Sequence, residues 1–200
     1  MLLLVGLGNP GREYEGHRHN VGFRVVDAIR EAQGWPDFKP KFSGAWTRGA
    51  LGEHSVALLK PQGYMNLSGE SVQPAAAFLK VPPQDIVVIH DELDLEWKDV
   101  RIKVGGGHAG HNGVRNIIER LGSAAFVRVR VGIGSPVRAG RDAADWVLSN
   151  FDAVEREELS GVVAAAVSAV RSVVELGPAA AMNRVNVRAS PASLEKDGAK

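Results

Sequence analysis

The sequence contains no cysteine, and this absence excludes several kinds of site at once. A chain without thiols forms no disulfide framework and no thiolate metal site, and it offers no cysteine nucleophile. The composition suits a reducing compartment, and we expect the protein to be cytoplasmic.

Long hydrophobic runs are also missing. Residues 1–5 are apolar, but they lack a cationic start and Gly6 follows them, which is unlike a signal peptide. The most apolar later stretch, residues 161–174, contains Arg171 and is shorter than the ~20 residues that span a bilayer. We therefore expect no membrane insertion.

Neither sign of charge is in excess, since 24 Lys and Arg face 23 Asp and Glu, for a net charge of +1. This balance neither indicates nor excludes a nucleic-acid partner, because such binding needs only a local basic face. The 200 residues contain no internal repeat, low-complexity tract or linker. They predict one domain over residues 1–186 and a polar, disordered tail over residues 187–200.

Strand-like and helix-like patterns alternate along the chain. Continuous apolar runs or a period of two predict strands over residues 2–5, 42–48, 55–59, 86–89, 100–104 and 127–131. Helical periodicity predicts helices over residues 21–29, 68–79, 114–121 and 159–174. The alternation indicates an α/β fold: a single-domain twisted mixed sheet flanked by helices on both faces, with ligands near the strand ends.

Several residues suggest where these helices begin and end. Asn20 could cap the first helix, and either Asn66 or Ser68 could cap the second. Gly122 is expected to end the third helix, and Gly177-Pro178 the last.

The segment Gly6-Leu7-Gly8-Asn9-Pro10-Gly11 matches the dinucleotide-binding pattern G-x-G-x-x-G, but we reject that reading. In that fold a helix begins within the glycine loop, whereas Pro10 and the polar residues 12–19 delay helical periodicity here. Asp27 also falls inside the helix, where it is misplaced for binding a ribose. A tight turn is the simpler interpretation.

A histidine and an aspartate are candidates for acid–base chemistry. His19 precedes the first helix, and Asp91 ends a strand that we expect to be central, so the two side chains could meet. An imidazole with a pKa near ~6.5 can accept a proton from water, and a carboxylate can fix its tautomer and stabilise the cation. We interpret His90 and His54 as structural.

Residues 105–113 carry five glycines and lead directly into a helix that starts near His111 and Asn112. Such a segment brings backbone N–H groups close to an anion or a polarised carbonyl.

A metal site is the alternative for the two histidine pairs, His17 with His19 and His108 with His111. The chain has neither an H-E-x-x-H motif nor clustered carboxylates, so we expect no metal and no cofactor.

Taken together, the motifs resemble those of the bacterial peptidyl-tRNA hydrolases over about residues 2–134. They are Gly6-Leu7-Gly8-Asn9-Pro10-Gly11, Arg18-His19-Asn20-Val21-Gly22, Lys60-Pro61, Met65-Asn66-Leu67-Ser68-Gly69, His90-Asp91-Glu92-Leu93-Asp94-Leu95, the glycine segment through Asn112-Gly113, and Arg130-Val131-Gly132-Ile133-Gly134. The last third of the chain resembles the family mainly in its helices and in Asn183-Arg184-Val185.

The resemblance implies that the protein is a monomeric, metal-independent hydrolase that cuts the ester between a peptide and the 3′ end of tRNA. The partner it implies is peptidyl-tRNA, contacted at the 3′ CCA end and the acceptor arm. It assigns the general base to His19, the orienting acid to Asp91, and the placing of water and oxyanion to Asn9 and Asn112. The residues implied for the peptide end are Tyr14, Met65, Asn66 and His111, and those for the tRNA 5′ phosphate are Lys103 and Arg130.

Side-chain amides suit this substrate, because the N-acyl amide of a peptide has neutral donor and acceptor ends that an asparagine can pair. A site built for that amide would disfavour the free ammonium of aminoacyl-tRNA.

Strand periodicity supports the phosphate site. Arg101 and Lys103 alternate with apolar residues on one predicted strand, and Arg128 and Arg130 do so on another. If these strands are neighbours, like charges gather on one face and favour an anionic partner.

Three residues depart from the family pattern: His17 where threonine is usual, Gly63 where threonine is common, and Ala109 where glycine is usual. None removes a catalytic group. A non-catalytic RNA-binding protein on the same fold, and a metal-dependent hydrolase, are the alternatives. Loss of His19 or Asp91 would favour the first, and chelator-sensitive activity the second.

Overall fold

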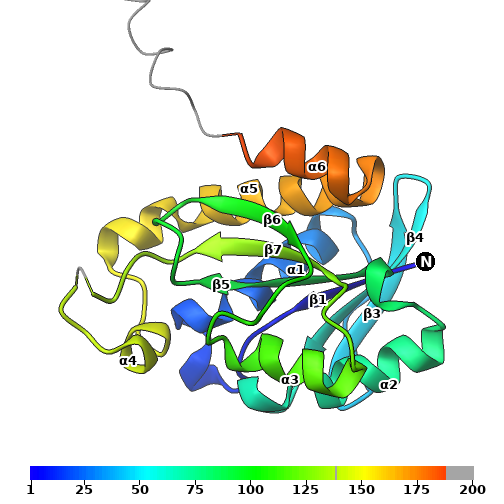
Figure 1. Ribbon diagram of the computed structural model, residues 1–200, viewed down its shortest axis with the longest axis horizontal. Coiled ribbons are helices and arrows are strands. Elements are labelled where there is room, and N and C mark those ends of the chain that lie inside the picture. The colour runs from blue at the N-terminus through cyan, green and yellow to red at the C-terminus, as the bar shows by residue number, and fades with distance from the viewer. Residues whose placement is uncertain (138, 188–200) are drawn as a thin grey trace, which may run out of the picture.

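The computed structural model describes residues 1–137 and 139–187, which form a seven-stranded mixed sheet (Figure 1). The strand order is β2-β3-β4-β1-β5-β7-β6. The strands are β1 (Leu2–Gly6), β2 (Lys39–Lys41), β3 (Gly44–Leu51), β4 (His54–Pro61), β5 (Ile86–Glu92), β6 (Val100–Val104) and β7 (Val127–Gly132). The four central strands pair in parallel, and antiparallel pairs form both edges. The predicted mixed α/β sheet is confirmed.

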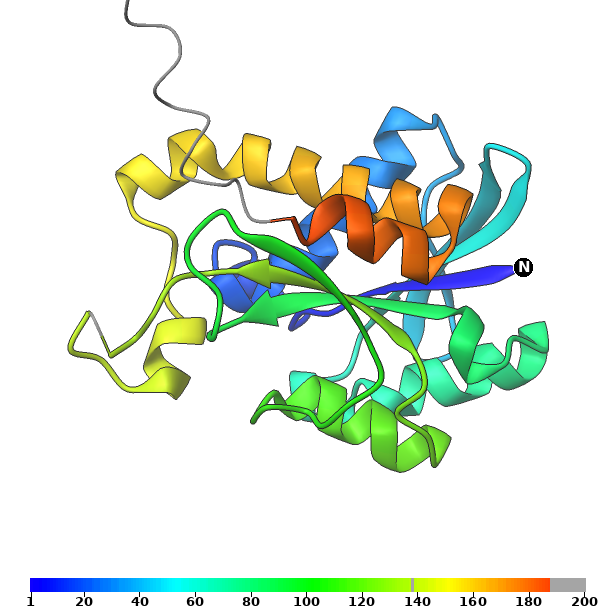
Figure 2. The same ribbon diagram turned by 45° about the horizontal axis from the view of Figure 1, so that its top comes forward.

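Helices cover both faces of the sheet (Figures 1 and 2). One face packs against α1 (Val21–Ala32), α5 (Ala153–Leu176) and α6 (Pro178–Val185), and the other against α2 (Gly69–Leu79) and α3 (Asn112–Leu121). Successive side chains of a strand point to opposite faces, so Leu4 of β1 enters the first core and its neighbours Leu3 and Val5 the second. The buried strands therefore read as continuous apolar runs.

Two glycines hold α1 against the central strands. A Cβ on Gly6 would lie 2.3 Å from the Gly22 carbonyl oxygen, and one on Gly22 would lie 2.4 Å from the Ile89 carbonyl oxygen. Only glycine permits so close an approach of backbone to backbone. This contact brings the start of α1, and the residues just before it, to the carboxyl ends of β1 and β5.

The loop after β1 agrees with our rejection of a dinucleotide site. Two short 3₁₀ helices, η1 (Arg12–Tyr14) and η2 (Arg18–Asn20), separate the glycines from α1. The helix that could meet a pyrophosphate therefore begins ten residues beyond Gly11.

The expected strand over residues 42–48 was wrong at its start. Phe42 and Ser43 form the turn of the β2–β3 hairpin, with φ values of +57° and +49°. Left-handed backbone is uncommon outside glycine, asparagine and aspartate, so neither residue signals a turn.

Of the two residues expected to cap α2, Ser68 stands at the N-cap, but it makes no side-chain capping hydrogen bond. A 3₁₀ helix, η3 (Met65–Leu67), precedes α2, and neither Asn66 nor Ser68 caps it through its side chain. The Ser68 hydroxyl donates instead to the Met65 carbonyl oxygen, 2.7 Å away.

The C-terminal helix is longer than expected because a capping box starts it earlier. Asp152 and Glu155 each accept a hydrogen bond from the other's backbone N–H. Pro178 ends α5 but also begins α6, where its missing N–H leaves no hydrogen bond unmade. Neither α6 nor the short helix α4 (Ala143–Val147) was predicted.

Asn186, just beyond α6, closes the exposed edge of the sheet. Its side-chain amide pairs with both the N–H and the carbonyl of Ile102 in the edge strand β6, at 2.8 Å each. An edge strand covered in this way offers fewer free groups to another chain. The predicted tail lies, from residue 188 onward, outside the described residues.

Among the described residues, α5 is the one helix with the length and composition that could cross a membrane, with a mean hydropathy of 1.6. Its buried residues, such as Val162, Ala166 and Val170, pack in the core against the sheet.

Candidate active site

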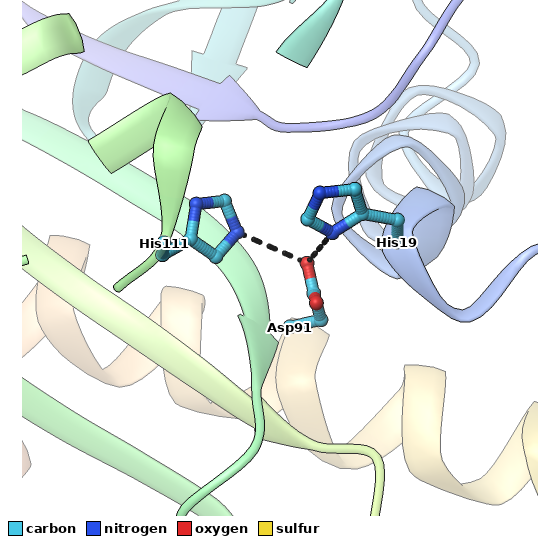
Figure 3. Close-up of side chains that lie close together, drawn as sticks. All are labelled: His19, Asp91 and His111. Carbon is cyan, nitrogen blue, oxygen red and sulfur yellow. Dashed lines mark hydrogen bonds and ion pairs between the residues drawn. The ribbon is translucent and has the colours of Figure 1, made fainter. Parts of the chain in front are cut away.

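His19 and Asp91 meet at the carboxyl edge of the sheet (Figure 3). His19 lies in η2 and Asp91 near the end of β5. The His19 Nδ1 is 2.8 Å from the Asp91 Oδ1, and both residues are buried. The two side chains that the sequence suggested could meet are therefore in direct contact.

His111 contacts the same carboxylate oxygen from the other side (Figure 3). Its Nε2 lies 3.1 Å from the Asp91 Oδ1, and its Nδ1 accepts the backbone N–H of Val114, 3.3 Å away, which caps α3. Because a backbone N–H can only donate, Nδ1 must be unprotonated. The neutral ring therefore carries its proton on Nε2 and donates it to Asp91.

Asp91 is an ionised carboxylate at the centre of this cluster. Burial alone would raise its pKa, but attraction to His19, then to His111, and the hydrogen bonds from both rings hold the pKa well below its usual range. An ionised carboxylate only accepts, so the His19 Nδ1 donates. The lone pair of His19 is then on Nε2, where it can accept a proton.

His90 lies beneath the cluster and stays neutral. Burial, followed by the neighbouring His111, lowers the pKa of His90 to about 3. Its Nδ1 bonds the Asp91 carbonyl oxygen at 2.7 Å, and its ring packs edge-on against His111 with centroids 4.7 Å apart. The packing agrees with our structural interpretation of His90.

Asn9 is held by a second polar cluster beside the base. Its Oδ1 accepts the N–H of Met65 at 2.7 Å. Asn20 pairs with the backbone N–H and carbonyl of Asn9, at 2.9 Å each, and does not cap α1 through its side chain. Since the Asn9 oxygen is engaged, its Nδ2 is left as a donor.

A cleft of about 430 Å³ opens over the cluster. Its lining includes His19, Asp91, His111 and Asn112. The lining residues Asp142, Ala143, Ala144 and Val147 belong to α4 and its capping residue. A second cavity of about 370 Å³ is lined by Asn9 and Asn20 together with the charged residues Glu15, Arg24, Asp27 and Lys60.

The residues expected at the peptide end differ in exposure. The half-buried Tyr14 ring packs edge-on against His17 and Tyr64, with centroids 5.3 and 6.4 Å away. Asn66 is exposed, whereas Met65 is only 5% exposed. Met65 thus offers little surface, and its backbone instead holds Asn9.

The two strands with the basic residues, β6 and β7, are neighbours in the sheet, which is the condition under which their like charges gather on one face. Arg101 pairs with Arg130 and Lys103 with Arg128 across β6 and β7. Lys103 and Arg130 line an open cavity of about 490 Å³ at this edge.

Arg130 has a counter-anion within the protein, because its Nε lies 2.8 Å from the Glu92 carboxylate. Arg128 is buried and donates to the carbonyls of Gly106 and Gly107. Lys103 is exposed and forms no ion pair within residues 1–137 and 139–187.

Two of the three departures have visible structural effects. Ala109 has a φ of +48°, a conformation that glycine adopts without strain. Burial and then the nearby His19 lower the pKa of His17, so this unusual histidine is electrostatically coupled to the site. A side chain on Gly63 would contact Leu67, with Cβ atoms 3.2 Å apart.

The same cluster contains a possible set of metal ligands, because donor atoms of His19, Asp91 and His111 lie within 4.8 Å of one another. The His19 Nδ1, the His111 Nε2 and the Asp91 Oδ1 are engaged in histidine–aspartate hydrogen bonds. A cation bound by these three atoms would displace both ring protons.

Four neighbouring residues were not assigned to the site from the sequence: Arg18, Asn20, Glu92 and Trp146. Three of them lie inside the motifs Arg18-His19-Asn20 and His90-Asp91-Glu92, so adjacency to the candidate base and acid was an available signal. Trp146 gave none, because it lies in α4, a helix without a predictive pattern.

Comparison with known proteins shows the family of this chain. The family model described as peptidyl-tRNA hydrolase matches residues 3–193. A peptidyl-tRNA hydrolase from Sorangium cellulosum is 52% identical over 98% of this chain and 88% of its own length. One from Clostridium novyi is 46% identical over 93% and 98%.

A solved structure supports the same assignment. The crystal structure of peptidyl-tRNA hydrolase from Acinetobacter baumannii aligns with a TM-score of 0.86 and 40% identity, covering 94% of this chain and 95% of that one. The matches span nearly all of the chain. The chain therefore belongs to the peptidyl-tRNA hydrolase family.

Proposed function

We propose that His19 is the general base with which this member of the peptidyl-tRNA hydrolase family cleaves the ester between a peptide and the 3′ end of tRNA. The observation that carries the proposal is the 2.8 Å contact between the His19 Nδ1 and the buried Asp91 carboxylate. This contact fixes the tautomer, so that Nε2 is free to accept a proton from water.

The reaction follows from that tautomer. A water proton moves to Nε2 of His19 while the water oxygen bonds to the ester carbonyl carbon. The bond from this carbon to the ribose oxygen then breaks, and the imidazolium returns its proton to that oxygen. The products are a free peptide and a tRNA with its hydroxyl restored, and the Asp91 charge stabilises the imidazolium in between.

The Nδ2 of Asn9 and the exposed Asn112 are the donors for the attacking water and the developing oxyanion. Met65 N–H engages the Asn9 oxygen, so the amide presents its nitrogen in a fixed orientation. A donor that is oriented before the reaction stabilises the oxyanion more than a mobile one.

The peptide end is recognised by Tyr14, Met65, Asn66 and His111. Asn66 pairs with the N-acyl amide of the substrate, and this pairing distinguishes peptidyl-tRNA from aminoacyl-tRNA, which has an ammonium there.

The substrate preference is tested by measuring hydrolysis of N-acyl-aminoacyl-tRNA against aminoacyl-tRNA, with wild-type protein and Asn66→Ala. We expect strong preference for the N-acylated substrate in the wild type and a reduced preference in the variant. Equal rates on both substrates in the wild type would contradict the proposed function. An unchanged preference in Asn66→Ala would remove only the role of Asn66.

The remaining features of the proposal concern the whole molecule. A single domain over residues 1–186 acts as a monomer in the cytoplasm, where its substrate arises. It contacts the 3′ CCA end and acceptor arm of peptidyl-tRNA, and Lys103 and Arg130 bind the 5′ phosphate.

The reaction uses neither a metal nor a cofactor. The atoms of the possible ligand set are engaged with one another, and a cation on His19 or Asp91 would remove the base or its partner. Full activity after exhaustive dialysis against a chelator is expected. Activity that is lost on dialysis and restored by one metal would favour the metal-dependent hydrolase instead.

A further inference from the structure

Arg18, the residue before the candidate base, is a buried arginine whose two terminal guanidinium nitrogens both have hydrogen-bond partners. It is only 3% exposed. One guanidinium nitrogen donates to the Ser149 hydroxyl, 3.1 Å away, and to the Asn150 carbonyl, and the other donates to the Glu155 carboxylate. The fork thus binds the segment that joins α4 to α5, and the first turn of α5.

The guanidinium also contacts α4, the helix that contributes to the lining of the cleft. It stacks on the Trp146 ring of α4, with the carbon Cζ 3.9 Å from the ring centroid. The Trp146 indole N–H in turn donates to the Ile133 carbonyl just beyond β7, at 3.1 Å. Trp146 is therefore held between Arg18 and the end of a central strand.

Backbone contacts also join the segment before His19 to the segment after α4. The Arg18 N–H donates to the Ser149 carbonyl at 3.0 Å, and His17 forms a β-bridge with Asn150. Two segments far apart in the sequence, one leading to His19 and one following α4, are thus joined over several residues.

The geometry points to Arg18 as a positioning residue for catalysis. Through Trp146 and the start of α5, it sets the position of the His19 imidazole relative to α4, and both line the cleft. This inference rests on the proposed role of His19 as the base. Arg18 is a positioning residue because it is buried and is not among the residues that line the cleft.

Stability alone does not account for such an arrangement. A buried ion pair can often be replaced by apolar side chains without loss of stability, because desolvation offsets the attraction between the charges. Apolar side chains cannot replace the directional hydrogen bonds of the guanidinium. A two-pronged guanidinium fixes its partners in a plane, and a displacement of about 1 Å at a catalytic group can cost on the order of 10²-fold in rate.

Three variants separate position from stability. Arg18→Lys keeps a cation near Glu155 but cannot form the fork to Ser149 and Asn150. The double variant Arg18→Met with Glu155→Gln removes both charges, keeps apolar contact with Trp146, and leaves a glutamine able to serve the capping box. Arg156→Met is the matched control, because Arg156 donates to the Phe151 carbonyl near the same helix start without touching the His19 segment.

Each protein is assayed on N-acyl-aminoacyl-tRNA for kcat and KM, well below its thermal midpoint, with His19→Ala in parallel. We expect Arg18→Lys and the double variant to lose about 10- to 10²-fold in kcat with little change in KM. Arg18→Lys should keep a thermal midpoint near that of the wild type but should not keep its kcat. Arg156→Met should keep the wild-type kcat whatever its thermal stability.

The inference is overturned if folded Arg18→Lys and the folded double variant both keep kcat within about twofold of wild type, or if KM alone changes. It is also overturned if the Arg18 variants lose no more kcat than Arg156→Met loses for a comparable fall in thermal midpoint. Retained activity in His19→Ala would instead refute the role of the base, so the two failures are distinguishable.

Discussion

His111 reaches the Oδ1 of Asp91 at 3.1 Å with the ring nitrogen that does not cap α3. That oxygen also accepts from His19 at 2.8 Å, so one carboxylate oxygen holds two imidazoles in fixed tautomers. A substitution at Asp91 can therefore remove the negative charge while the hydrogen bonds to both histidines are kept.

Asp91→Asn tests the charge. The asparagine oxygen can accept both histidine N–H groups while the amide nitrogen replaces Oδ2, so the arrangement can persist without its negative charge. We expect kcat to fall about 10- to 10²-fold, less than on removal of the base, with little change in KM. A variant in which KM alone rises would show that Asp91 binds substrate and does not support the base.

The helices, the strands and the meeting of His19 with Asp91 could be predicted from the sequence because the sequence patterns that indicate them are local. β5 (Ile86–Glu92) begins with a continuous apolar run and carries Asp91 near its carboxyl end, and parallel strands bring such ends together. Asn20 stands at the N-cap of α1 as predicted, but its side chain bonds the backbone of Asn9 and makes no capping hydrogen bond.

Other features depend on tertiary contacts that no local sequence pattern predicts. The five residues of α4 are too few for helical periodicity, and the Phe42–Ser43 turn contains no residue that favours positive φ. Strand alternation located the basic residues, but only the register and the ion pair revealed that Glu92 neutralises Arg130.

His90 predicts how stability depends on pH. An unfolded chain protonates this histidine near its ordinary pKa of 6.5, whereas the folded pKa is about 3. The unfolded state therefore binds more protons between these values, so the contribution of His90 is full above pH 6.5 and is lost as the pH falls toward 3. The shift corresponds to a loss on the order of 5 kcal/mol.

Denaturant unfolding from pH 7 to pH 4 measures this effect. The unfolding free energy of wild type should fall across the range, and His90→Gln should give a shallower decline. The control is His54→Gln, at an exposed histidine, which should keep the wild-type slope. Identical slopes in His90→Gln and wild type would rule out His90 as the source.

Lys103 provides the clearer test of the tRNA phosphate site, because Arg130 already has a carboxylate partner. Lys103→Ala should raise KM for peptidyl-tRNA and make the log–log salt dependence of binding shallower by about one unit. A minimal substrate ending at the 3′ adenosine cannot reach the site, so its hydrolysis should barely change. Equal damage to both substrates would show that Lys103 supports the catalytic centre or the fold.

The most direct test of the account is the turnover of His19→Ala on N-acyl-aminoacyl-tRNA, with tRNA binding and thermal unfolding measured on the same preparation. His54→Ala, at an exposed histidine outside both cavities of the site, serves as the matched control. We predict that His19→Ala remains folded, still binds tRNA, and loses at least ~10²- to 10⁴-fold in kcat, as expected for a positioned general base. Near-normal turnover in the folded variant would contradict the assignment of His19 as the base.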